Sequence, residues 1–248
     1  MSAAPRYSVV VPVFHEEANV AAFCRAVRDT FPPGYELLVC HDTLDDPTLP
    51  ALAALPEHER PPQVRLVHNT LGRGVRYAIE AGMRAAQAPV VVVTMVDLSD
   101  DYRIVEEMVA RVERGAAVVC ASRYVRGGRQ IGGPFLKGMM SRVAGVSLCW
   151  LGGIPTHDPT NSFKAYERAF LLATPIESPA GFALALELTV KAHFAGRRVE
   201  EIPATWRDRT AGESRFRLFA WLPHYLRWYF WALRRRVGLA PRATRQRG

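Results

Sequence analysis

Short aliphatic runs alternate with amphipathic segments along the first half of the chain. β-Strands are predicted at residues 7–13, 36–40, 64–68, 89–94 and 116–121, and those at 7–13 and 116–121 are expected to be buried. Between them, apolar residues recur at spacings of three and four, which predicts helices at residues 16–31, 71–86 and 102–114. Strands that alternate with helices in this way predict an α/β fold, with a mainly parallel central sheet and helices on both faces.

Polar side chains follow several of the predicted strands, and the carboxyl ends of parallel strands form the edge where ligands bind. The acidic residues among them are Glu16, Glu17, Asp42, Asp45, Asp46, Asp97, Asp100 and Asp101. Carboxylates from three strand ends predict a site for a hard divalent cation and a hydroxyl-rich ligand. Any single acid has an alternative role as a helix cap, and Asp45 or Asp100 could serve only in that way.

The positive charge is concentrated at the C-terminus. Of the 32 Lys and Arg residues, nine lie in residues 215–248, which contain no acidic residue, so the rest of the chain is almost neutral. The segment 216–237 is also rich in Trp and Tyr, which predicts an amphipathic helix at a membrane interface; a helix packed on the body is the alternative. Residues 238–248 are expected to form a basic, disordered tail. No nucleic-acid partner is expected, because the body adds no basic surface.

Composition and length place the chain among globular proteins. It has 248 residues, a net charge of +8 and 49% hydrophobic residues, and this length suits one large domain or two small ones. The four cysteines form no CxxC pair, which favours a reducing compartment.

We recognise no signal peptide, and residues 218–233 would form a helix of roughly 24 Å, too short for the ~30 Å bilayer core. A cytoplasmic protein, attached peripherally to the cytoplasmic membrane, is therefore expected.

Seven segments match known motifs in the expected order. They are VPVFHEEANV (11–20), HDTLDDPT (41–48), NTLGRGVRYAIEAGMRAA (69–86), TMVDLSDD (94–101), ASRYVRGG (121–128), DPTNSFKAY (158–166) and DRTAGESRF (208–216). Together they resemble the inverting family 2 glycosyltransferases, in the branch of the dolichol-phosphate mannose synthases and other polyprenyl-phosphate glycosyltransferases. The resemblance implies a GT-A (nucleotide-diphospho-sugar transferase) fold for residues 1–215.

The resemblance also implies a reaction: transfer of a hexose of the mannose or glucose type to a polyprenyl (dolichyl or undecaprenyl) phosphate. The donor would be a nucleotide-diphosphate sugar of the GDP-mannose or UDP-glucose type, and the cofactor Mg²⁺ or Mn²⁺. Such an acceptor is already anionic, so the transfer needs no strong general base. Two other possibilities stay open: a family 2 enzyme with a non-lipid acceptor, and a non-catalytic homologue that binds nucleotide sugars.

Site residues follow from the matching motifs. Asp97 and Arg209 would be catalytic, and Asp97 and Ser99 would bind the metal. The donor would contact Pro12, Phe14, Glu16, Asp42, Val96, Asp97 and Arg209. The acceptor phosphate would contact Arg123, Lys137 and Ser141, of which the last two are four residues apart and share one helix face.

Two positions depart from the family pattern. Met95 takes the place of the first aspartate of the DxD motif, and His41 takes the place of the first aspartate of the DDGS loop. A thioether is a poor ligand for Mg²⁺ or Mn²⁺, which prefer oxygen. We therefore expect the metal site to have lost one anionic contact, with Asp97 as its remaining carboxylate.

Overall fold

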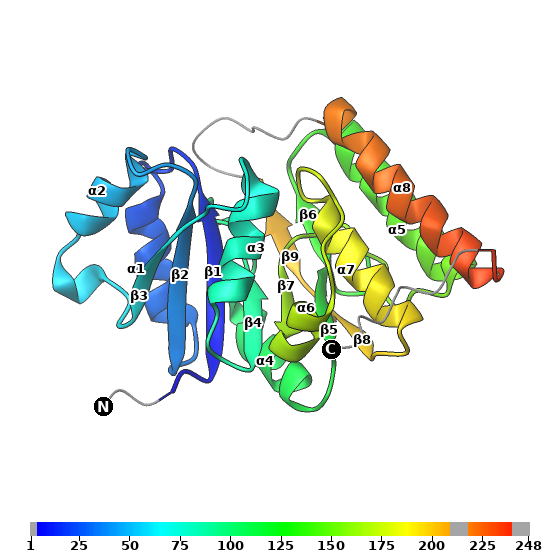
Figure 1. The fold of residues 1–248 in the computed structure, drawn as a ribbon, viewed down its shortest axis with the longest axis horizontal. Coiled ribbons are helices and arrows are strands. Elements are labelled where there is room, and N and C mark those ends of the chain that lie inside the picture. Colours follow the sequence, from blue (N-terminus) through cyan, green and yellow to red (C-terminus); the bar gives the residue numbers. More distant parts are fainter. Residues whose placement is uncertain (1–3, 209–217, 240–248) are drawn as a thin grey trace.

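The computed structural model describes residues 4–208 and 218–239 (Figure 1). Within them, one central sheet has the strand order β3-β2-β1-β4-β7-β5-β8. The strands are β1 (Tyr7–Val13), β2 (Tyr35–His41), β3 (Val64–His68), β4 (Val90–Val93), β5 (Val118–Ser122), β7 (Lys164–Glu167) and β8 (Val199–Pro203). A separate short pair joins β6 (Arg129–Ile131) to β9 (Thr205–Arg207).

The predicted, mainly parallel sheet is confirmed. β1 and β3 have the predicted bounds, and the other predicted strands begin or end within two residues of the prediction. β7 was not predicted; it lies between β4 and β5 and runs antiparallel to both. Its N-terminal end therefore lies at the edge where the parallel strands on either side have their carboxyl ends.

Helices cover both faces of the sheet, as predicted. The remaining elements are α1 (Val20–Thr30), α2 (Thr48–Ala53), η1 (Glu57–Glu59), α3 (Val75–Ala85), η2 (Tyr102–Ile104), α4 (Val105–Glu113), α5 (Phe135–Gly152), α6 (Arg168–Ala173), α7 (Ala183–Phe194) and α8 (Leu218–Arg236). Alternate residues of β1 belong to different cores: Val9 and Val11 pack with α1 and α4, whereas Val10 packs with α3. This is the two-residue period of a strand that is buried on both sides.

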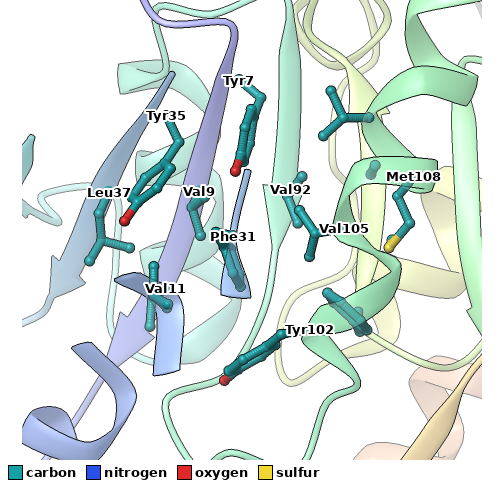
Figure 2. Close-up of a cluster of buried hydrophobic side chains, with 14 of the residues drawn as sticks. Tyr7, Val9, Val11, Phe31, Tyr35, Leu37, Val92, Tyr102, Val105 and Met108 are labelled. Carbon is teal, nitrogen blue, oxygen red and sulfur yellow. The ribbon is translucent and has the colours of Figure 1, made fainter. Parts of the chain in front are cut away.

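An aromatic cluster fills the core on the α1 and α4 face (Figure 2). The rings of Phe31 and Tyr102 meet edge to face, with centroids 5.2 Å apart, and Phe31 meets Tyr35 in the same way at 5.9 Å. Tyr7 donates a hydrogen bond of 2.6 Å from its hydroxyl to the carbonyl of Pro32. On the opposite face of the sheet, α3 packs closely against β1. A Cβ at Gly82 of α3 would lie 2.5 Å from the Val10 side chain, so only glycine lets α3 come this close to β1.

Helix α7 is buried on all sides. Every residue from Ala183 to Ala192 is buried, because the sheet lies on one side of α7 and the pair α5 and α8 lies on the other. Its one acidic residue, Glu187, forms a salt bridge of 2.7 Å with Lys191 and accepts the backbone N–H groups of Glu177 and Ser178. Glu187 is thus a buried, fully bonded structural residue that does not line the cavity described below.

Helix α8 packs beside α5 at the outer end of the molecule (Figure 1). Trp228 holds it in place: the side chain is only 2% exposed, and its indole N–H donates a 2.8 Å hydrogen bond to Ser178 Oγ. The Lys191 ammonium lies 4.9 Å from the Trp228 ring, a cation–π contact. No helix among the described residues is both long enough and apolar enough to cross a membrane.

The burial of Trp228 predicts a large effect of truncation. We expect Trp228→Ala to lower the free energy of unfolding by about 3–5 kcal/mol, because it leaves a cavity between α7 and α8 and removes the partner of Ser178. Urea unfolding monitored by circular dichroism measures this. Phe230→Ala is the matched control on the same helix; its ring is 51% exposed, so its effect should be much smaller. Equal effects of the two substitutions would contradict the anchoring role.

Candidate active site

One large cavity, of about 1290 Å³, lies at the carboxyl ends of β1, β2 and β4. It extends from these strand ends to the space between α5 and α8. All the site residues named from the sequence that the structure describes line it: Pro12, Phe14, Glu16, Asp42, Val96, Asp97, Ser99, Arg123, Lys137 and Ser141. Arg209, the other expected site residue, lies outside the described residues.

The turn after β1 presents Phe14 at the cavity wall. The neighbouring residue His15 has a left-handed backbone (φ 56°), and its N–H group donates to the carboxylate of Asp46 at 3.2 Å. Asp46 is buried and also accepts the N–H of Thr48, so it fixes this turn against the start of α2. Phe14 is 49% exposed, which makes it a surface residue of the cavity and not part of the core. An exposed ring of this kind offers a face on which a nucleobase can stack.

The loop after β2 is held by Asp42. One carboxylate oxygen accepts the Asn69 side-chain amide at 2.7 Å and the other accepts the N–H of Gly74 at 2.6 Å. Asp42 therefore fixes the loop before α3 as well as lining the cavity. His41 is only 2% exposed; its ring stacks on His68, and its Nδ1 lies 2.9 Å from the Thr43 carbonyl. The departure at residue 41 is a packing feature of the strand and does not change the cavity wall.

The loop after β4 places the side-chain oxygens of Asp97 and Ser99 at the cavity. Leu98 has a left-handed backbone (φ 60°) within the loop, and the Ser99 N–H donates to Asp97 Oδ1 at 3.2 Å. Carboxylate and hydroxyl oxygens suit Mg²⁺ or Mn²⁺, so the chemistry of Asp97 and Ser99 fits the expected cation. In the part of the chain that the structure describes, no three His, Cys, Asp or Glu residues group closely enough to form a complete protein cage.

Asp100 also lines the cavity. Its Oδ2 accepts the Thr94 hydroxyl at 2.7 Å and the Met95 N–H at 3.4 Å. Burial, together with the nearby charge of Asp97, raises the pKa of this carboxyl to about 7. A role as a helix cap was the alternative for Asp100, but the residue that precedes η2 is Asp101, and no side-chain cap bond is formed there.

A buried ion pair forms the opposite wall. The guanidinium of Arg123 binds both carboxylate oxygens of Asp158, at 2.7 and 2.9 Å, and also donates to Ser141 Oγ at 3.1 Å. The Ser141 hydroxyl lies 2.7 Å from that of Thr160. Burial opposes the charge on Arg123, but the carboxylate of Asp158 outweighs it and holds the pKa of Arg123 above its ordinary value.

Helix α5 brings Lys137 and Ser141 to this wall. A Cβ at Gly145, one turn after Ser141, would lie 2.1 Å from the His157 carbonyl, so glycine is required where α5 crosses the loop before β7. A second buried cation lies beneath the same loop: Lys164 is fully buried and donates to the carbonyl of Asn161 at 2.5 Å and to that of Asp158 at 3.4 Å. Arg123 and Lys137 therefore line this wall of the cavity, and Lys164 is buried beneath the loop before β7.

Sequence reasoning missed the roles of Asp158, Thr160 and Lys164. The structure shows Asp158 as the partner of Arg123. All three residues lie in the DPTNSFKAY segment, so the motif marked the right place. Their pairing could not be read from it, because Arg123 is 35 residues away.

Comparison with known proteins identifies the family. The family model "Glycosyl transferase family 2" matches residues 8–173. A dolichol-phosphate mannosyltransferase of Pyrococcus furiosus is 25% identical over 234 residues, which cover 91% of this chain and 64% of the relative. A polyprenol monophosphomannose synthase of Mycolicibacterium smegmatis is 28% identical over 220 residues, 85% of this chain and 80% of the relative.

Solved structures support the fold. The glucosyl-3-phosphoglycerate synthase of Mycobacterium tuberculosis, in complex with Mn²⁺, UDP-glucose and phosphoglyceric acid, superposes with a TM-score of 0.64 at 18% identity. The alignment covers 96% of this chain and 81% of that structure. The protein has the GT-A fold of nucleotide-sugar transferases. It belongs to glycosyl transferase family 2, as the motifs indicated.

The buried ion pair predicts a strong dependence of stability on Asp158. We expect Asp158→Ala to lower the free energy of unfolding by about 3–5 kcal/mol, because Arg123 is left buried without a counter-charge. Urea unfolding measures this. Glu59→Ala is the control: it removes a 2.7 Å ion pair with Arg25, whose side chain is 47% exposed, and should cost no more than about 1 kcal/mol. Similar losses of unfolding free energy in the two variants would contradict a greater stabilising role for the buried pair of Arg123 and Asp158.

Proposed function

We propose that the protein is an inverting glycosyltransferase that moves a hexose from a nucleotide-diphosphate sugar to a polyprenyl phosphate. The observation that carries this proposal is the continuity of the cavity. It joins the ends of β1, β2 and β4, where a nucleotide would lie, to the cationic wall around Arg123, and then to an apolar cleft between α5 and α8. Donor, acceptor phosphate and lipid chain therefore each find a matching surface in one space.

The donor half suits a nucleotide diphosphate. Phe14 offers a ring for the base, and Asp97 and Ser99 would hold the divalent cation. Bound there, Mg²⁺ or Mn²⁺ would neutralise the negative charge that grows on the departing diphosphate. Arg209 is expected to share this task, because a guanidinium binds phosphate oxygens through two hydrogen bonds. Its place in the motif supports that role, which stays a prediction because the residue lies outside the described part.

The acceptor half suits a phosphate. Arg123, whose guanidinium is paired with Asp158, and Lys137 line this wall, and the buried Lys164 lies beneath the loop that carries Asp158. Arg123 and Ser141 are held in a hydrogen-bonded frame and would orient the phosphate oxygens. The phosphate oxygen is already negative at neutral pH and can attack the sugar carbon without a general base.

The lipid is the part of the acceptor that α5 and α8 would bind. The cleft between them is lined mainly by apolar and aromatic side chains: Met139, Met140, Val143, Ala144, Trp221, Leu222, Tyr225, Leu226 and Tyr229. A chain of isoprene units has the same apolar character. The Pyrococcus relative is named a dolichol-phosphate mannosyltransferase and the Mycolicibacterium relative a polyprenol monophosphomannose synthase, and both names point to the same class of acceptor.

Transfer to a lipid can be measured directly. Purified protein is incubated with Mn²⁺, a radiolabelled donor (GDP-mannose or UDP-glucose) and undecaprenyl or dolichyl phosphate, and the products are partitioned between water and an organic solvent. We expect label in the organic phase with one of the donors. We also expect Lys137→Ala to raise the KM for the lipid phosphate more than it lowers kcat, because Lys137 binds the acceptor.

The other outcomes identify the alternatives. Label in a new water-soluble product, formed when phosphoglyceric acid replaces the lipid, would indicate a small phosphorylated acceptor, the kind bound in the solved M. tuberculosis synthase. Nucleotide binding without any transfer would indicate a non-catalytic homologue. Either result would overturn the proposed acceptor.

We further propose that α5 and α8 rest on the membrane. Their exposed apolar side chains form what we call the paired-helix surface: Phe135, Leu136, Met139, Val143, Trp150 and Leu151 of α5, with Leu226 and Phe230 of α8. The two helices lie side by side (Figure 1). Exposed arginines accompany these residues, namely Arg142, Arg234 and Arg236. Apolar side chains beside arginines suit an anionic lipid surface.

Vesicle binding tests the paired-helix surface. The double variant Trp150→Asp/Phe230→Asp should bind vesicles of phosphatidylglycerol at least about tenfold more weakly, because each side chain contributes on the order of 1.5–3 kcal/mol when buried. The control is Leu66→Asp/Leu172→Asp, which changes exposed leucines of β3 and α6 and should bind as the wild type does. Sedimentation with vesicles measures both. Unchanged binding of the first variant would contradict this docking surface.

A further inference from the structure

The metal site has lost the carboxylate that the family pattern places at residue 95. Met95 now packs against the core on the α3 face of the sheet. Its sulfur is a poor ligand for Mg²⁺ or Mn²⁺. A site with Asp97 as its only carboxylate would carry less negative charge, and the number of charged ligands is one of the properties that set the affinity for a hard cation.

Asp100 lies where it can replace the missing group. The chain turns back on itself after Val96, and the left-handed Leu98 lies within this turn. As a result, Asp100 Oδ2 is bonded to the N–H of Met95 itself, and also to the hydroxyl of Thr94. The carboxylate of residue 100 is thus fixed beside the backbone of residue 95.

The second oxygen of Asp100 is available. Among the described residues, no hydrogen bond or salt bridge engages Asp100 Oδ1, while Oδ2 is anchored. Asp100 lines the same cavity as Asp97 and Ser99. Arg123 also lines the cavity, but its guanidinium is taken by Asp158. Two carboxylates that face one cavity repel each other, and a divalent cation between them would remove that repulsion.

We infer that Asp100 supplies the second carboxylate ligand of the divalent cation, in place of the aspartate that Met95 replaces. The inference rests on the proposed function, because it concerns the cation that the sugar donor requires. Ser99, Asp97 and Asp100 would then form the protein's share of the site: one hydroxyl and two carboxylates, all hard oxygen donors.

Mn²⁺ binding tests the inference without any transfer reaction. Free Mn²⁺ is followed by electron paramagnetic resonance during titration of the full chain in the presence of GDP and, separately, UDP. We expect Asp100→Asn to weaken Mn²⁺ binding at least about tenfold, a loss found even for groups that only support a metal ligand. Asp97→Asn should have a similar effect.

A matched control and a rescue complete the experiment. Asp101→Asn changes the adjacent carboxylate, which pairs with Arg103 at 2.8 Å and does not line the cavity, so Mn²⁺ binding should stay within about twofold of the wild type. Met95→Asp, added to Asp100→Asn, should restore binding by returning a carboxylate to residue 95. Thermal melting of each metal-free variant shows that it is folded.

The results separate this inference from the proposed function. If the wild type binds Mn²⁺ with a nucleotide and Asp100→Asn binds it equally well, Asp100 is not a ligand, and the proposed function is unaffected. If the wild type binds no Mn²⁺ with either nucleotide, the metal part of the proposed function fails and the inference fails with it. A loss in Asp100→Asn that Met95→Asp does not restore would also overturn the inference, because the two positions would then not be equivalent.

Discussion

The half of the cavity that we propose binds the acceptor depends on the buried ion pair between Arg123 and Asp158. Arg123 follows β5, Asp158 precedes β7, and the hydroxyl of Ser141 joins α5 to the same pair. A buried guanidinium is stable only with a counter-charge and a full set of hydrogen bonds, so these three segments hold one another in place. The pair also fixes the guanidinium of Arg123 at the cavity wall, beside the hydroxyl of Ser141.

Much of the fold was readable from the sequence because burial leaves a simple pattern. Strands covered on both faces are continuous aliphatic runs, and the run at β1 gave the correct bounds. The bounds of β3 were also correct, although this edge strand is only partly buried. β7 was missed for a physical reason: it has only four residues and begins with Lys164, a charged residue that is buried because backbone carbonyls surround its ammonium. No local pattern indicates a partner that only the tertiary structure supplies.

The candidate site was predictable in its location and less so in its details. Parallel strands bring their carboxyl ends together, so the residues that follow β1, β2 and β4 had to be neighbours. The role of each residue depended on long-range contacts. Asp100 has the same sequence context whether it caps a helix or faces a cavity. The two departures from the family pattern likewise differ in kind, since His41 is buried in a stack with His68 and Met95 borders the cavity.

The anchoring of α8 by Trp228 has a consequence for how the molecule would meet a lipid bilayer. The indole is locked between α7 and Ser178, so α8 cannot swing outward as a hinged arm. An enzyme that docks through α5 and α8 would stand at a fixed tilt, with its reaction centre at a fixed height above the headgroups. The reach to a membrane-embedded substrate would then be set by the rigid geometry of the helices and not by the length of a flexible tether.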